Sequence, residues 1–265
     1  MNNEVIGIDI SQENNINILY STRTETKLWD LRAPEPVTIH QYGFINKCCL
    51  DAQGLSVGLS TEEGFLAIWD IRAMKSQTFL QADMMSTITS MTFSHSGDNL
   101  ACGYRNGTVI LRERTEDWNV KREFSPIPHP VSSLRFYEPE TLFIGSHGCL
   151  ARSHLNASEG LQDKVLRLEN WGSSFVSETA VLDGNANIAV FSHRPLLRCE
   201  VYSIDHENES WNTQRLEELV EKETMSNVST SSDTQDDETV FKKPQPVPDI
   251  KEIDVLVSLL RIFNC

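Results

Sequence analysis

The feature that most constrains the fold is a six-residue segment that occurs twice, forty residues apart. Lys27–Arg32 (KLWDLR) recurs as Ala67–Arg72 (AIWDIR). Each copy ends a short run of alternating apolar residues. Similar runs come before it, and polar turns separate them. Around the second copy these turns are Asp51–Gly54 and Glu62–Gly64. Short alternating runs between glycine-bearing turns predict antiparallel β-sheet.

The same layout continues in weaker form along the chain. Further units of run, turn and run cover Ile88–Leu111 and Val131–His154, and a fifth covers Glu178–Tyr202. The period is about 40–43 residues, the length of a four-stranded propeller blade. The sequence therefore predicts an all-β fold over residues 1–215, a β-propeller of four-stranded antiparallel blades of which about five are recognisable.

The chain resembles the WD-repeat β-propellers. The residues that carry the resemblance are Leu28-Trp29-Asp30, Ile68-Trp69-Asp70 and the turn Ser94–Asp98. It implies that the blade-packing signature consists of Trp29, Asp30, Trp69 and Asp70. Each tryptophan is then expected in the core or wedged against the neighbouring blade, where its indole buries a large apolar area.

The chain departs from this family in two respects. Glu63, Asn106 and His147 stand where the family has an Asp before the third strand, so we expect packing rather than a buried polar network to hold these blades. Most members have seven blades, whereas about five fit here, and an unfilled ring leaves apolar sheet faces exposed. Three interpretations stay open: a five-bladed or open ring, a ring completed by another chain, and an incomplete gene product.

Composition bounds the class of function. The net charge is −15, and an acidic surface disfavours direct binding of nucleic acid. No apolar run reaches the length of a membrane span, and the first twenty residues lack the pattern of a secretory signal. Six cysteines without a framework spacing fit a reducing compartment, so we expect a cytoplasmic and/or nuclear location.

The chain is not expected to be an enzyme. Its seven histidines are scattered, no histidine pair has the helical spacing of metal ligands, and no Gly-x-Ser-x-Gly or phosphate-binding loop occurs. We therefore predict no catalytic residue, no metal site, no cofactor and no small-molecule substrate.

Beyond the predicted propeller, residues 216–248 form an acidic, Ser/Thr-rich linker. Residues 216–238 hold eight acidic side chains and one basic one, and this composition predicts disorder. Thr230 and Thr234 each precede an Asp by three residues, Asp233 and Asp237, which makes them candidate phosphorylation sites for acid-directed kinases.

Residues 249–265 are predicted to form a C-terminal helix. Asp249 can cap it, with Glu252 three residues on. One face carries four apolar residues: Ile253, Leu256, Leu260 and Phe263. The opposite face is also apolar, so we expect the helix either to pack on its own propeller or to dock in a partner's groove.

Arg32 and Arg72 are candidate partner contacts. Trp-Asp-x-Arg, preceded by Ser60–Gly64, resembles the box of WD-repeat receptors for cullin-4 ubiquitin ligases. That resemblance implies that the arginine meets the ligase adaptor, and a planar guanidinium suits such a contact. The first copy fits less well, because Thr24-Glu25 replaces Asp-Gly.

The predicted function is that of a non-catalytic scaffold, a WD-repeat subunit that recruits other proteins to a multiprotein complex. One alternative is a substrate receptor of a cullin-4 ubiquitin ligase. A second is a structural subunit of a large assembly such as the nuclear pore, based on a faint likeness of Val131–Leu134 and Leu150–Leu155 to a small WD-repeat nucleoporin.

Overall fold

The computed structural model describes most of the region predicted to be β. The described residues are 5–11, 17–40, 44–73, 75–81, 86–137, 141–155, 164–168, 176, 178–181, 187–192, 198–205 and 210–214. The acidic linker 216–248, the helix 249–265, and with them Thr230, Thr234, Ile253, Leu256, Leu260 and Phe263, lie outside the described residues.

Five four-stranded antiparallel sheets, here called blades 1 to 5, follow one another along the chain. Blade 1 contains β1 (Val5–Ile10), β2 (Asn17–Thr22), β3 (Thr26–Asp30) and β4 (Val37–His40). Blade 2 contains β5 (Ile45–Leu50), β6 (Ser56–Thr61), β7 (Phe65–Asp70) and β8 (Lys75–Gln81). Blade 3 contains β9 (Ile88–Phe93), β10 (Asn99–Tyr104), β11 (Val109–Glu113), the 3-10 turn η1 (Arg114–Glu116) and β12 (Asn119–Phe124). Blade 4 contains β13 (Ser133–Tyr137), β14 (Thr141–Ser146), β15 (Cys149–His154) and β16 (Lys164–Arg167). Blade 5 contains β17 (Glu178–Val181), β18 (Asn187–Ser192), β19 (Arg198–Asp205) and β20 (Ser210–Gln214).

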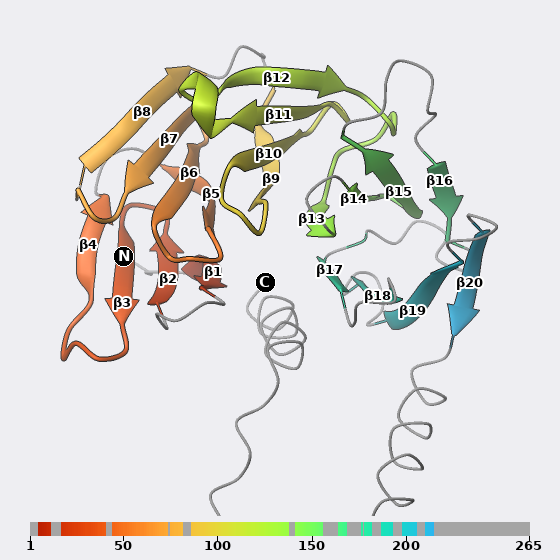
Figure 1. Cartoon of the computed structure of the whole chain (residues 1–265), viewed down its shortest axis with the longest axis horizontal. Coiled ribbons are helices and arrows are strands. Elements are labelled where there is room, and N and C mark those ends of the chain that lie inside the picture. The colour runs from red at the N-terminus through yellow and green to blue at the C-terminus, as the bar shows by residue number, and fades with distance from the viewer. Residues whose placement is uncertain are drawn as a thin grey trace, which may run out of the picture.

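The blades are arranged around a central axis with the first strand of each innermost (Figure 1). Consecutive inner strands pack on one another, β1 on β5, β5 on β9, β9 on β13 and β13 on β17. Within each blade the strands pair in chain order. This arrangement confirms the predicted all-β fold of four-stranded antiparallel blades.

The five blades form an arc. Among the described strands, β17 does not pack on β1 in the way that the other inner strands pack on each other. No described sheet combines strands from the two ends of the chain, because every sheet is built from four consecutive strands. Blade 1 therefore has a neighbouring blade on one side, and its other sheet face borders the opening of the arc (Figure 1).

Apolar clusters fill the space between consecutive blades. The cluster between blades 1 and 2 includes Leu19 and Leu28 on one side and Val57 and Leu59 on the other. Three further clusters lie between blades 2 and 3, blades 3 and 4, and blades 4 and 5. Because strand side chains alternate between the two sheet faces, each interior blade contributes one set of residues to the blade before it and one to the blade after it.

A repeated hydrogen bond links the inner strands. The side chain of Asn46 donates to the carbonyl oxygen of Ile88, which lies 42 residues further along the chain. Thr89 donates to Val131 over the same separation, and Ser132 donates to the carbonyl of Val176, 44 residues away. In blades 2, 3 and 4, a polar residue at or next to the start of the inner strand thus links its blade to the following one and satisfies a main-chain carbonyl group.

Candidate functional site

Trp29 and Trp69 occupy the same place in blades 1 and 2. Each lies on the third strand directly before the aspartate, and each faces a residue of the second strand, Ile18 opposite Trp29 and Val57 opposite Trp69. Because strand residues alternate, each tryptophan points to the sheet face opposite to that of the residue before it, Leu28 or Ile68.

In blade 2 this face is covered by blade 1. Trp69 and Ile71 pack on a cluster that joins Leu50 and Val57 of blade 2 to Leu28 of blade 1. The side of Ile68, by contrast, faces blade 3 and belongs to the next cluster. The tryptophan therefore points toward the preceding blade.

In blade 1 no described blade precedes the equivalent face. Trp29 is 37% exposed and Leu31, the counterpart of Ile71, is 45% exposed. The side chains of this surface, called here the outer face of blade 1, are Ile10, Ile18, Tyr20, Trp29 and Leu31. Ile18 and Tyr20 are half-buried, whereas their counterparts Val57 and Leu59 are fully buried in blade 2.

The outer face is held in place by local contacts. The Trp29 indole Nε1 donates to the carbonyl oxygen of Ala33 at 3.1 Å, which fixes the ring without a neighbouring blade. Lys27 lies on the same face and forms an ion pair with Glu25 at 3.0 Å, and the hydrogen bond from this pair raises the pKa of Lys27. The surface is thus apolar and aromatic, and the charge of its lysine is balanced by the ion pair with Glu25.

The two arginines of the repeated segment differ in their partners. Arg32 is clamped on Asp30, with Nε 2.9 Å from Oδ1 and Nη2 2.6 Å from Oδ2. These hydrogen bonds lower the pKa of Asp30 to about 2. In both blades Oδ1 of the aspartate accepts the main-chain N–H group of the arginine, at 3.0 Å in blade 1 and 2.8 Å in blade 2. In blade 2, Oδ1 of Asp70 also accepts the N–H group of Ala73 at 3.1 Å.

Arg72 is therefore the more available of the two guanidinium groups. Its side chain is exposed, and within the described part of the chain it forms no salt bridge of the kind that Arg32 forms with Asp30. The two arginines lie at equivalent turns, each directly after the third strand of its own blade.

No known protein-family profile matches the sequence, and no curated protein sequence matches it. Solved structures, by contrast, include 1486 chains that match, so the architecture is a common one. One of them is a chain in the crystal structure of the mitotic checkpoint complex. It superposes with a TM-score of 0.58 over 78% of this chain and 75% of that chain, at 10% identity. The fold is a β-propeller. At this identity the likeness defines the architecture and carries no information on partners.

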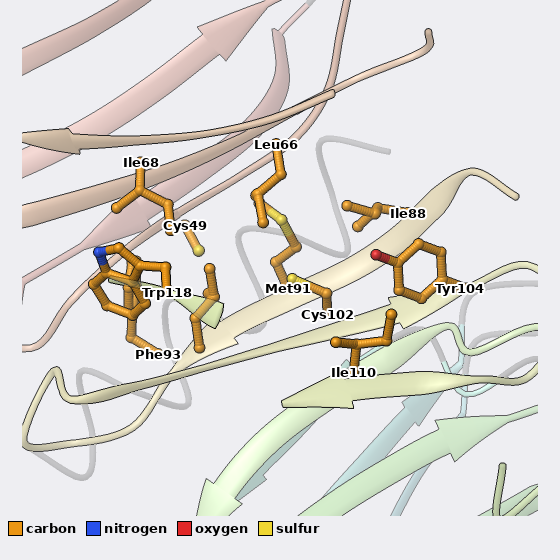
Figure 2. Packing of buried hydrophobic residues seen from close by; sticks show 11 residues of the cluster. Cys49, Leu66, Ile68, Ile88, Met91, Phe93, Cys102, Tyr104, Ile110 and Trp118 are labelled. Atoms are coloured by element: carbon orange, nitrogen blue, oxygen red, sulfur yellow. The ribbon is translucent and has the colours of Figure 1, made fainter. Parts of the chain in front are cut away.

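The third blade of the propeller shows a site that the sequence pattern did not reveal. Arg112 occupies the place that Trp69 has in blade 2, and it is buried. Trp118, which follows η1, fills the cluster between blades 2 and 3 and meets Phe93 edge-on at a centroid distance of 5.8 Å (Figure 2). Nη1 of Arg112 donates to the carbonyl oxygen of Trp118 at 3.1 Å. An indole from a turn thus replaces the one missing from the strand.

The cysteines of the propeller behave as small apolar residues. Cys49 and Cys102 are buried in the cluster between blades 2 and 3. Burial raises the pKa of Cys102 to about 12 and shifts the pKa of Cys49 in the same direction, so neither thiol ionises at neutral pH. Such thiols are unsuited to nucleophilic chemistry.

Within the described ranges, no group of three or more His, Cys, Asp or Glu side chains is placed to hold a metal ion. None of the helical structure in that part of the chain is long and apolar enough to cross a membrane.

Proposed function

We propose that this chain is a non-catalytic protein-interaction module that binds another protein through the outer face of blade 1. One observation carries the proposal. The same strand positions form a buried inter-blade interface in blade 2 and, in blade 1, a partly exposed surface that no described blade covers. Fully burying a large apolar side chain contributes about 1.5–3 kcal/mol, so a partner gains by covering this face.

The composition of the face fits a protein partner. Tyrosine and tryptophan are the residues that most often dominate binding energy at protein interfaces, and Tyr20 and Trp29 lie on adjacent strands here. The blade 1–blade 2 interface shows which surface complements these positions, namely aliphatic side chains such as Leu19 and Leu28. The net charge of −15 supports a protein rather than a nucleic acid as partner.

The cysteines support an intracellular setting for this function. Cys48, Cys49, Cys102 and Cys149 are free thiols, as is usual in a reducing compartment. We place the interaction in the cytoplasm or the nucleus on this ground.

The test is affinity purification of the full chain and of Trp29→Asp from the same cells. The variant should lose at least about tenfold of a partner that the wild type captures, equivalent to about 1.4 kcal/mol, because a charge replaces an aromatic anchor. Val165→Asp is the control, since Val165 is 45% exposed on β16, far from blade 1 in the chain order of the arc. Equal recovery by both variants and by the wild type would contradict the proposal.

A second candidate function is a receptor role in a cullin-4 ubiquitin ligase. The contrast between the two arginines favours it, because Arg32 forms an ion pair with Asp30, whereas Arg72 is exposed and forms no such ion pair among the described residues. An exposed guanidinium can form charge-assisted hydrogen bonds with an adaptor.

For this candidate, Arg72→Ala is expected to reduce capture of the purified cullin-4 adaptor by about fivefold or more, as for loss of one charge-assisted hydrogen bond. Arg32→Ala should have a smaller effect, because Arg32 is engaged by Asp30. Neither substitution should change the melting temperature, since both side chains are exposed. Absence of adaptor binding by the intact protein would remove this candidate and leave the outer face of blade 1 unaffected.

A further inference from the structure

The uncovered face of blade 1 is matched by an apolar segment of the same chain. We propose that residues 249–265 pack on the outer face of blade 1 and that a partner must displace them to bind. This inference rests on the proposed function, because it treats the same face as the binding surface and adds its regulation.

The first argument is composition. Downstream of β20, which ends at Gln214, the stretch 224–239 is polar and acidic and contains no aromatic residue. Residues 249–265, in contrast, carry large apolar side chains through most of their length, including Leu256, Leu260 and Phe263. A segment that is apolar on both predicted helical faces is costly to leave in water.

The second argument is the fit to an established interface. In blade 2, Leu19, Leu28 and Ile39 of blade 1 cover the positions equivalent to the outer face. Residues 249–265 are rich in leucine and isoleucine, the same side-chain types that cover these positions in blade 2, and would offer them to Ile18, Trp29 and Leu31. The proposed contact therefore continues the series of aliphatic interfaces that joins the blades.

The third argument is reach. Blade 5, where β20 lies, is the other blade that borders the opening of the arc (Figure 1). A flexible coil as long as the linker 216–248 spans about 30–35 Å on average, and more than about 100 Å when fully extended. A tether of this length keeps the segment at an effective concentration on the order of millimolar, which is sufficient for a weak contact to be occupied.

The experiment places a photoreactive side chain in the full chain by Phe263→p-benzoylphenylalanine and maps the cross-links by mass spectrometry. Cross-links within one molecule should join position 263 to peptides that contain residues 17–31. The matched control carries the same group at Val220, in the acidic linker, and should give at least about fivefold less of this product because nothing holds it at the face. Leu256→Asp combined with Leu260→Asp should remove the product and increase recovery of the partner.

Three outcomes would overturn the inference: cross-links between two molecules, which would indicate a second copy as occupant; cross-links to other blades; and cross-links that persist in the Asp variant. The two proposals fail separately. If Trp29→Asp loses a partner and no cross-link reaches residues 17–31, the C-terminal segment is not the occupant and the binding function stands. If the cross-link forms and no partner depends on Trp29, the face serves only intramolecular packing and the proposed function is wrong.

Discussion

Replacing Trp118 with alanine is expected to lower the free energy of unfolding by about 3–5 kcal/mol, the usual cost of removing a fully buried aromatic side chain. Trp118 is 2% exposed and lies edge-on against Phe93 in the cluster between blades 2 and 3. Alanine keeps the carbonyl oxygen that accepts the hydrogen bond from Arg112. The loss is therefore one of packing, and chemical denaturation followed by circular dichroism measures it.

Val120→Ala is the matched control for this substitution. Val120 lies two residues away on β12 and is 40% exposed, so its truncation should cost less than about 0.5 kcal/mol, as is usual for a surface change. If the two variants unfold at the same denaturant concentration, Trp118 does not stabilise the interface between blades 2 and 3, and other side chains of that cluster must do so.

The role of Trp118 in the core could not be predicted from the sequence. The 40-residue period identifies the blades because every blade repeats the same strands and turns. It fails for this indole, because Arg112 stands at the periodic position and the ring arrives six residues later from a turn. Asp117 and Trp118 both have positive φ angles, 54° and 63°, which non-glycine residues rarely adopt. The periodic pattern of the sequence does not indicate such angles.

The short blade count predicts that an apolar sheet face is exposed, but the sequence does not indicate that this face is the one that carries Trp29. The sequence marks Trp29 and Trp69 as equivalent residues, and equivalence alone implies equal burial. Their environments differ because one blade precedes Trp69 and no described blade precedes Trp29, a property of the arc rather than of either segment. The signal for the inter-blade hydrogen bonds, in contrast, was present, since Asn46, Thr89 and Ser132 recur every 43 residues.

The glycine of the β10–β11 turn is the second position where a small change should have a large effect. Gly107 has a φ of +90°, which disfavours any side chain. A Cβ atom there would lie 2.2 Å from the carbonyl oxygen of Ile127 and 2.9 Å from that of His129, both main-chain atoms. The segment that contains Ile127 is fixed, because Ile127 is buried between blades 3 and 4 and the N–H group of Val131 donates to Tyr104 at 3.1 Å.

Gly107→Ala is therefore expected to destabilise the protein by about 2–4 kcal/mol, the sum of an unfavourable backbone angle and forced displacement of packed main chain.

Gly97→Ala is the control that distinguishes the cost of the backbone angle from the cost of displacing main chain. Gly97 has a similar φ of +76°, but its nearest neighbour would be a side-chain oxygen of Asp51 at 3.1 Å. That variant should lose about 1–1.5 kcal/mol, most of it from the backbone angle, because only the side chain of Asp51 has to move, by a few tenths of an ångström. Thermal unfolding of both variants tests this prediction. Equal melting temperatures would mean that the main chain around Ile127 moves to accommodate the new methyl group, and that the connection between blades 3 and 4 is not rigid.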